Sequence, residues 1–370
     1  MDLNAELERR HANVRAALAQ HDLHALVVSG SEYTGFEGAV TYLSGFQIVH
    51  RYAYVVVPVD GDAWVVFPAE ARYVGEHGTA RLEQAFDERP GAHIAARVKD
   101  EGWRRVGVYG LDYVMPVRDY HALSSLDGVE VVPFDVEFDL ARAVKSEAEL
   151  ESVRDSVRIN ERGFELFVEA YAPGRTAAEV MAAAEEWFVA EGCGRLTMNM
   201  VLTGTDELAR PEFKIARSDE VLGGFVLPSL EIAGPGMHWV EVSRAICPGE
   251  PSDDTKRMLE AYEEYFAAAR EAMRPGMTCH DVHQAVSAGF LDRGFHLGHV
   301  TGHSIGMTMI EFPKVGEGVD IELAEGMVFS MHPHAIAENG EDCLYMQETW
   351  LVTKSGGEPL STLPMQVFRA

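Results

Sequence analysis

The stretches Pro173-Gly-Arg-Thr-Ala-Ala-Glu-Val180 and Pro275-Gly-Met-Thr-Cys-His-Asp-Val282 repeat one pattern, 102 residues apart (275 against 173). Each has a Pro-Gly turn, then a threonine with an acidic residue three positions later, which is the capping box that starts many helices. At the same offset, further pairs match: Ala183 with Ala285, Phe188 with Phe290, and Gly192 with Gly294. Strand-rich sequence follows each copy. The repeat therefore predicts a duplicated α+β domain whose two halves enclose a central cleft.

The sequence before the repeat predicts an α/β domain. Residues 5–20 have the pattern of an amphipathic helix, and 24–30 that of a buried strand. Residues 51–68 predict two strands joined by a hairpin turn at Asp60-Gly61. Alternating strand and helix patterns continue to about residue 140, which is typical of a compact α/β fold.

A long helix is predicted between this domain and the repeat, within 145–174. Ser146 is its expected N-cap, and Glu149 completes a capping box. We place the domain boundary just before this helix. The expected organisation is an N-terminal domain at 1–143 and a C-terminal domain at 144–370, with halves at about 144–252 and 253–370.

Composition excludes several classes of partner. The 370 residues include 31 basic and 59 acidic ones, a formal net charge of -28, which argues against nucleic acid and anionic membranes as partners. No apolar run approaches the ~20 residues of a membrane span. The cysteines are scattered, without a CxxC pair, as expected in a reducing compartment. We therefore expect a cytoplasmic protein. The cysteines are Cys193, Cys247, Cys279 and Cys343.

Four motifs in the second half carry a family resemblance. They are His-Val-Thr-Gly-His-Ser-Ile-Gly (299–306), Glu-Phe-Pro (311–313), Glu-Gly-Met-Val-Phe-Ser-Met-His-Pro (325–333) and Gln-Glu-Thr-Trp-Leu-Val-Thr-Lys-Ser-Gly (347–356). The chain resembles the creatinase, prolidase, aminopeptidase P and methionine aminopeptidase family over nearly its whole length. The resemblance implies a creatinase-like α/β N-terminal domain followed by an α+β "pita-bread" domain with an internal duplication.

The same resemblance locates an altered metal site. Peptidase members of the family bind two metal ions through Asp, Asp, His, Glu and Glu. The matching positions here are Leu230, Glu241, His303, His332 and Gln347. Glu231 is next to Leu230, but successive strand residues point to opposite faces. The ligand charge would fall from minus four to minus one, which argues against a dimetal centre and therefore against ordinary dimetal peptidase chemistry.

Two interpretations of the altered site remain open. In one, Glu241, His303 and His332 hold a single Fe, Mn or Zn ion, with the carbonyl oxygen of Gln347 as a possible fourth ligand. In the other, no metal binds, as in creatinase. His303 or His332 would then act as general acid or base, and Glu241 or Glu348 would orient it or hold a cationic substrate group.

Substrate-binding residues are also implied. In creatinase, arginines hold the substrate carboxylate, and one of them comes from the partner subunit. The corresponding positions are Arg51 and Lys314. A homodimer in which Arg51 reaches the neighbouring site is therefore expected. Three further candidates are the histidines His238, His299 and His334.

The function expected from these observations is that of a small-molecule hydrolase or lyase, not an ordinary dimetal peptidase. It would act on a C–N or related bond of a small polar substrate, an amino acid or amine derivative. The alternative is a non-catalytic pita-bread protein that binds other proteins. A third possibility is an oxygen-using mononuclear iron enzyme, because two histidines and one carboxylate support that chemistry on other folds.

Overall fold

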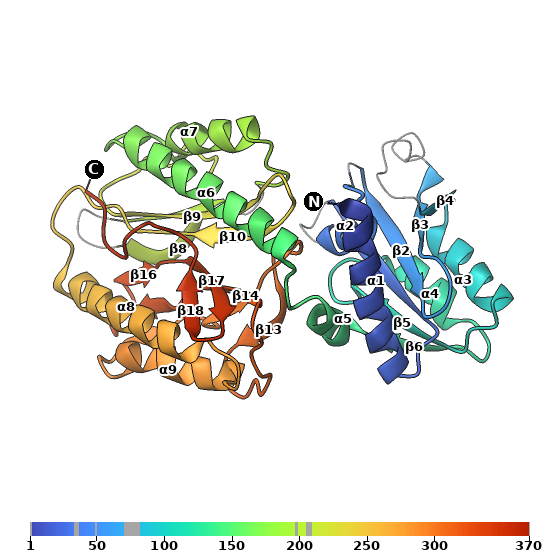
Figure 1. The fold of residues 1–370 in the computed structure, drawn as a ribbon. Coiled ribbons are helices and arrows are strands. Elements are labelled where there is room, and N and C mark those ends of the chain that lie inside the picture. Colours follow the sequence, from blue (N-terminus) through green and yellow to red (C-terminus); the bar gives the residue numbers. More distant parts are fainter. Residues whose placement is uncertain are drawn as a thin grey trace. The chain divides into compact units, whose positions relative to one another are not determined.

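The computed structural model describes residues 2–32, 37–48, 50–69, 82–196, 199–204 and 209–369, with 209–214 described only as backbone. The chain forms two compact units (Figure 1). Unit 1 comprises Met1–Arg142 together with the short segment Met307–Met309, and unit 2 comprises Ala143–Gly306 and Ile310–Ala370. Each unit has its own buried core. No helix among the described residues is long and apolar enough to cross a membrane.

Unit 1 is built around a mixed six-stranded sheet of order β4-β3-β2-β1-β5-β6. Alternate residues of the central strand β1 enter two different cores: Leu26 and Val28 pack with α1, α2 and α5, and Ala25 and Val27 pack with α3 and α4. A strand covered on both faces reads as a continuous apolar run, which explains the sequence pattern. The elements are α1 Leu3–Gln20, β1 Ala25–Ser31, α2 Gly38–Ser44, β2 Tyr52–Pro58, β3 Trp64–Phe67, β4 Glu83–Phe86, α3 Pro90–Asp100, β5 Arg105–Tyr109, α4 Val117–Ser124, β6 Glu130–Pro133 and α5 Asp135–Ala141.

Unit 2 places strands between two pairs of helices, α6 with α7 and α8 with α9 (Figure 1). Its sheets have the orders β10-β9-β7-β8, β13-β12-β14-β17-β18 and β11-β15-β16. The elements are α6 Glu147–Ala170, α7 Ala177–Ala190, β7 Met200–Gly204, β8 Ala209–Ile215, β9 Val226–Ala233, β10 Trp239–Val242, α8 Asp253–Ala272, α9 Cys279–Leu291, β11 His296–Leu297, β12 Gly302–Ser304, β13 Glu311–Val315, β14 Val328–Met331, β15 His334–Ile336, β16 Cys343–Tyr345, β17 Glu348–Thr353 and β18 Gly356–Pro359.

The predicted duplication is confirmed in detail. Thr176 caps α7 and Thr278 caps α9, each through a reciprocal capping box with the acidic residue three positions later. The glycine of each Pro-Gly turn has a positive φ, 93° at Gly174 and 87° at Gly276, which a residue with a side chain adopts only with strain. Each threonine also forms an antiparallel bridge to a later segment, Thr176 to Val221 and Thr278 to Glu322. The two halves are thus built alike from the helix cap onward.

The two larger sheets of unit 2 meet along β10 and β17. An antiparallel bridge joins Ser243, just after β10, to Gln347, just before β17. The backbone N–H of Glu241 donates to the Thr349 hydroxyl over 3.0 Å, which ties the strands together at this point. Residues on these strands therefore lie close to residues of β12 and β14, although they are far apart in the sequence.

Candidate functional site

Three buried side chains from three strands of unit 2 come together at the junction of the sheets. Glu241 lies on β10, His303 on β12, and His332 directly after β14. One donor atom from each lies within 4.8 Å of the others. Pairing of β12 with β14 produces this arrangement, because His303 lies opposite Ser330, and the backbone N–H of His332 donates to the Thr301 carbonyl over 2.8 Å.

The charges in this cluster are unequal. Burial disfavours the ionised form of Glu241, but the neighbouring His303 and His332 rings and the Ser330 hydroxyl outweigh it and lower its pKa to about 2. For His303, Glu241 outweighs burial and raises the pKa, with 3.4 Å between His303 Nε2 and Glu241 Oε1. Burial lowers the pKa of His332 to about 3, so its ring is neutral. Its Nδ1 has no hydrogen-bond partner within the described part of the chain.

The donor set fits a divalent transition-metal ion. Two imidazoles and one ionised carboxylate suit Fe(II), Mn(II) or Zn(II). A neutral imidazole is the form that binds a metal, and a buried nitrogen without a hydrogen-bond partner is rare in a folded protein. The unsatisfied Nδ1 of His332 is accounted for if that nitrogen is a metal ligand. The coarse expectation of a metal-binding Glu, His and His group therefore agrees with the geometry.

A second carboxylate, that of Glu231, adjoins this cluster, contrary to the prediction from the sequence. Glu231 on β9 lies directly opposite Glu241 on β10, whereas Leu230 pairs with Val242. Paired residues of antiparallel strands share a face, so Glu231 faces the cluster and Leu230 does not. The side chain of Glu231 is buried and accepts a hydrogen bond from the Gln347 amide over 2.9 Å. Glu231 therefore takes the place in the site that the sequence had assigned to Leu230.

The turn between β9 and β10 contains the signal that could have located Glu231. The backbone N–H of Gly234 donates to the carbonyl of His238, and Ala233 pairs with Trp239, so the hairpin is centred on Gly236. Glu231 and Glu241 each lie five residues from that centre, one on either side. Counting inward from both ends of the hairpin would have paired them. The prediction instead counted a fixed number of residues back along the chain from Glu241, and so arrived at Leu230.

Burial also changes the ionisation of Glu231. Desolvation is the largest cause, and the negative charge of Glu241 adds to it, so that the pKa of Glu231 is raised to about 8. Hydrogen bonds from Gln347 and Ser229 act in the opposite direction. The two carboxyl groups therefore differ at neutral pH: Glu241 is ionised and Glu231 is largely protonated.

Gln347 and Glu348 point to opposite sides of their strand. The Gln347 amide lies inside the cluster and contacts both Glu231 and Glu241. Glu348 instead forms a buried ion pair with Arg244 over 2.5 Å and accepts a hydrogen bond from the Ser361 hydroxyl over 2.6 Å. The structure thus brings Gln347 to the cluster, and Glu348 supports the fold on the other side of β17.

The remaining histidine candidates fall into two groups. His299 is an exposed residue whose ring centroid lies 5.0 Å from that of His332 and 5.5 Å from that of His334. Tyr345 joins this group, with its ring centroid 5.3 Å from His299. His238 is buried in the β9–β10 turn, where its Nδ1 lies 2.9 Å from the Ser152 hydroxyl on α6. His299 and His334 therefore adjoin the cluster, and His238 packs against a helix.

The two candidate cations are both exposed. Lys314 lies on β13, where its backbone pairs with that of His303, but its side chain faces solvent. Arg51 lies in unit 1 at the start of β2, with a left-handed φ of 62°.

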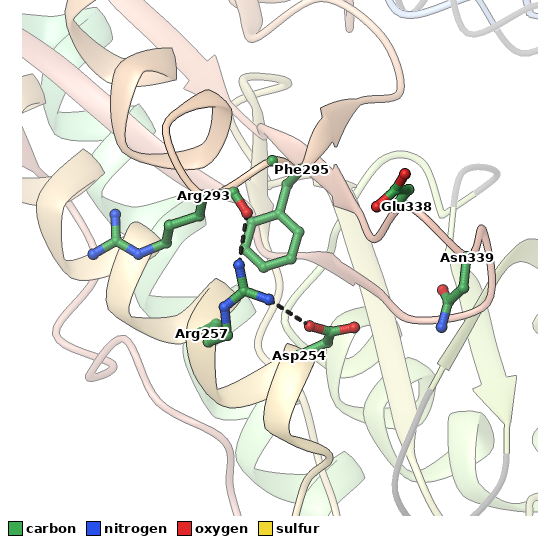
Figure 2. A pocket seen from close by; sticks show the side chains of 7 residues that line it. Asp254, Arg257, Arg293, Phe295, Glu338 and Asn339 are labelled. Carbon is green, nitrogen blue, oxygen red and sulfur yellow. Dashed lines mark hydrogen bonds and ion pairs between the residues drawn. The ribbon is translucent and has the colours of Figure 1, made fainter.

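Unit 2 also has a surface pocket of about 470 Å³, at the ends of α8 and α9. Figure 2 shows Arg257 donating to Asp254 over 2.8 Å and to the Arg293 carbonyl over 2.6 Å. The Arg293 guanidinium is paired with Glu264. Both arginines of this pocket are thus paired with acidic side chains of the protein. Its lining residues are Asp254, Arg257, Arg293, Gly294, Phe295, Glu338 and Asn339.

Comparison with protein-family models gives two matches that together span most of the chain. The model described as metallopeptidase family M24 matches residues 151–354, and the one described as the creatinase/prolidase N-terminal domain matches residues 10–144. The first contains every member of the cluster.

Individual relatives match over nearly their whole length. The probable dipeptidase PepE of Mycobacterium tuberculosis is 28% identical over 378 residues, covering 97% of this chain and 96% of the relative. The Xaa-Pro dipeptidase of Pyrococcus furiosus is 24% identical over 336 residues, covering 87% and 90%. The crystal structure of dipeptidase PepE from Mycobacterium ulcerans, 24% identical, superimposes with a TM-score of 0.82, covering 100% of this chain and 99% of that one. The superposition with the Mycobacterium ulcerans structure shows that the two chains share a fold.

These comparisons contradict the function expected from the sequence. We expected a small-molecule hydrolase or lyase instead of an ordinary peptidase, and that expectation is wrong. The matched family is one of metallopeptidases, and the relatives that align along most of the chain include a probable dipeptidase and an Xaa-Pro dipeptidase. One ground for the expectation was too low a count of carboxylates, because Glu231 was assigned to the opposite face of β9.

Proposed function

Because this chain belongs to metallopeptidase family M24, we propose that it is a metal-dependent peptidase that hydrolyses short peptides. The observation that carries the proposal is the buried group formed by Glu241, His303 and His332. Support for short substrates comes from the relatives, which are a probable dipeptidase and an Xaa-Pro dipeptidase. The proposed substrates are dipeptides, with or without proline in the second position.

In the proposed mechanism, Glu241, His303 and His332 would hold the divalent ion. When bound, such an ion polarises a carbonyl oxygen and lowers the pKa of a coordinated water. Glu241 contributes one ionised oxygen on the side of the imidazoles, and its other oxygen accepts a 2.5 Å hydrogen bond from the Ser330 hydroxyl. This second contact fixes the direction in which the ligand oxygen points, as outer-shell hydrogen bonds commonly do.

The substrate would enter beside His299. Its ring is exposed, yet it contacts the rings of His332 and Tyr345, so it adjoins the buried group from the solvent side. Partial burial of the ring against its neighbours lowers the pKa of His299, which favours a neutral ring able to accept or donate a hydrogen bond to a peptide group. We propose that His299 orients the substrate and that the neighbouring ring of His334 holds the His299 ring in place.

Arg51 retains a proposed role in substrate binding. The proposal is that the protein forms a homodimer in which Arg51 reaches the neighbouring site and holds a substrate carboxylate. Changing Arg51 to Ala should raise KM for a dipeptide more than for the corresponding dipeptide amide, which lacks the carboxylate. Equal effects on both substrates, or a monomer by analytical ultracentrifugation with full activity, would refute this role.

The main test is hydrolysis of dipeptides by protein freed of metal and then supplied with Mn²⁺, Zn²⁺, Co²⁺ or Fe²⁺. We expect cleavage of at least one dipeptide with at least one ion, and at least a hundredfold lower kcat in His303→Ala. A suitable control is His296→Ala, an exposed histidine on β11, which should retain activity. The proposal fails if folded protein cleaves none of the dipeptides with any of these ions.

A further inference from the structure

We infer that the site takes a single divalent ion, because the Gln347 amide lies between Glu231 and Glu241, where a second ion would have to bind. The inference depends on the proposed function, which supplies the first ion. It concerns the number of ions and the residue that takes the place of the second. The inference is based on the hydrogen bonds around the buried amide of Gln347.

The two N–H donors of the Gln347 amide are directed at two carboxylates. Nε2 donates to Glu231 Oε1 over 2.9 Å and to Glu241 Oε2 over 3.0 Å. A primary amide has two N–H groups, so these bonds use its donor capacity. The hydroxyl of Tyr345 lies farther from the same nitrogen, at 3.4 Å. An ion between the two carboxylates would compete with this nitrogen for the same oxygen atoms.

The orientation of the amide is determined by its surroundings. Its oxygen, Oε1, lies 2.8 Å from the Ser229 hydroxyl, which shares its one proton between this oxygen and Glu231 Oε1 at 2.9 Å. Turning the amide over would place that oxygen against the ionised carboxylate of Glu241, which is unfavourable without a cation. The backbone of Gln347 is also held, because its carbonyl accepts from Arg244 Nη1 over 2.7 Å and from the N–H of Ser243. The side chain is fully buried, so it has little room to move aside.

The two oxygens of Glu241 divide the site into an imidazole side and an amide side. Oε1 is the atom 3.4 Å from His303, and Oε2 accepts from the Gln347 amide and the Ser330 hydroxyl. On the imidazole side an ion has three donors, from Glu241, His303 and His332. On the amide side, N–H and O–H groups already donate to Glu231 Oε1 and Glu241 Oε2, which a second ion would need as ligands. Hydrogen bonds there offset the repulsion between two buried carboxyl groups.

The inference predicts that one change will create a second ion site. Gln347→Glu replaces the bridging N–H groups with a third carboxylate close to Glu231 and Glu241. Three buried carboxyl groups repel one another strongly unless a cation is present, and five side chains could then surround two ions. The wild-type protein should bind one Mn²⁺ per chain, and Gln347→Glu should bind two.

Equilibrium dialysis against Mn²⁺ measures the number of ions, and electron paramagnetic resonance shows whether they are neighbours. The wild type should give the six-line spectrum of an isolated Mn²⁺, and Gln347→Glu the broadened spectrum of a coupled pair. Gln366→Glu makes the same chemical change on the surface and is the matched control. It should bind one ion, like the wild type. His303→Ala should bind none at the same Mn²⁺ concentration.

The outcomes separate this inference from the proposed function. Two coupled ions in the wild type would overturn the single-ion inference and leave the peptidase proposal standing. No bound ion in the wild type, together with no hydrolysis of dipeptides, would overturn the peptidase proposal. One ion in folded Gln347→Glu would show that the amide does not take the place of an ion. The wild-type spectrum alone tests the inference if that variant fails to fold.

Discussion

Glu231 and Glu241 lie directly opposite each other on the paired strands β9 and β10, and one amide nitrogen, that of Gln347, donates a hydrogen bond to each. Two buried carboxyl groups on one face of a hairpin would ordinarily destabilise it. Here the amide joins them, and the neighbouring imidazoles favour ionisation of Glu241. The arrangement makes Glu241 the member of the pair that is prepared to bind a cation.

We expect the Ser330 hydroxyl to increase the affinity for the ion. Ser330→Ala removes the 2.5 Å hydrogen bond to Glu241 Oε2 and frees the carboxylate to rotate. Loss of such an outer-shell bond typically weakens metal binding about 10–100-fold. Isothermal titration calorimetry with Mn²⁺ measures this loss. Ser355→Ala, on an exposed turn, should leave the dissociation constant unchanged, and equal constants for Ser330→Ala and the wild type would contradict the assigned role.

Metal binding should raise the melting temperature. An ion that binds only the folded state stabilises it by about 2.7 kcal/mol when its free concentration is 100 times the dissociation constant. Metal-free protein should therefore melt at a lower temperature than protein with Mn²⁺. Differential scanning calorimetry should show this shift in the wild type and His296→Ala. His303→Ala should lose it, and an undiminished shift in that variant would place the ion elsewhere.

Arg244 should be far more important for stability than a surface arginine. Its buried guanidinium pairs with Glu348 and donates to the carbonyls of Gln347 and Leu363. Arg244→Met leaves Glu348 buried without its cation, which should cost about 3–5 kcal/mol. Arg154→Met breaks only an exposed pair with Glu147 and should cost about 0–1 kcal/mol. Urea unfolding measures both, and similar losses would refute the difference.

The stability of unit 1 should fall in mild acid because of His11. This buried ring lies with its Nε2 2.7 Å from the Leu43 carbonyl. Burial is the largest effect and lowers its pKa below the ordinary value of 6.5. The unfolded chain therefore binds a proton more readily than the folded one, so stability is lost as pH falls below 6.5.

The variant His11→Gln isolates this contribution, because it keeps a donor for Leu43 but cannot be protonated. The free energy of unfolding should decrease less between pH 7.5 and 5 in His11→Gln than in the wild type. Urea unfolding across this range measures the difference between the two proteins. Parallel curves would show that His11 contributes nothing to the pH dependence.

Local sequence signals predicted much of the fold because local interactions determine those features. The capping boxes at Thr176 and Thr278 and the turn at Asp60-Gly61 each depend on a few neighbouring residues. The motifs around His303 and His332 likewise indicated two residues that β12 and β14 bring together. In these cases a short stretch of sequence contains the whole signal.

The parts of the site that the sequence missed depend on register and side-chain direction. Glu231 faces the cluster because of a turn centred on Gly236, and a change of one residue in that turn would have put Leu230 there instead. The role of the Gln347 amide depends on contacts with Ser229, Glu231 and Glu241, which come from three different strands or their ends. Composition and spacing do not encode such contacts.

The segment Met307–Met309, which belongs to unit 1, has a consequence for the order of synthesis. Met307 packs in the core of unit 1, and the Thr308 hydroxyl accepts a 2.9 Å hydrogen bond from Arg142. A ribosome that has completed Arg142 has not yet made these residues, although domains generally begin to fold while the chain is still being synthesised. The first unit therefore completes its core only after most of the second has been translated, and a gene fragment ending at residue 142 would encode it incompletely.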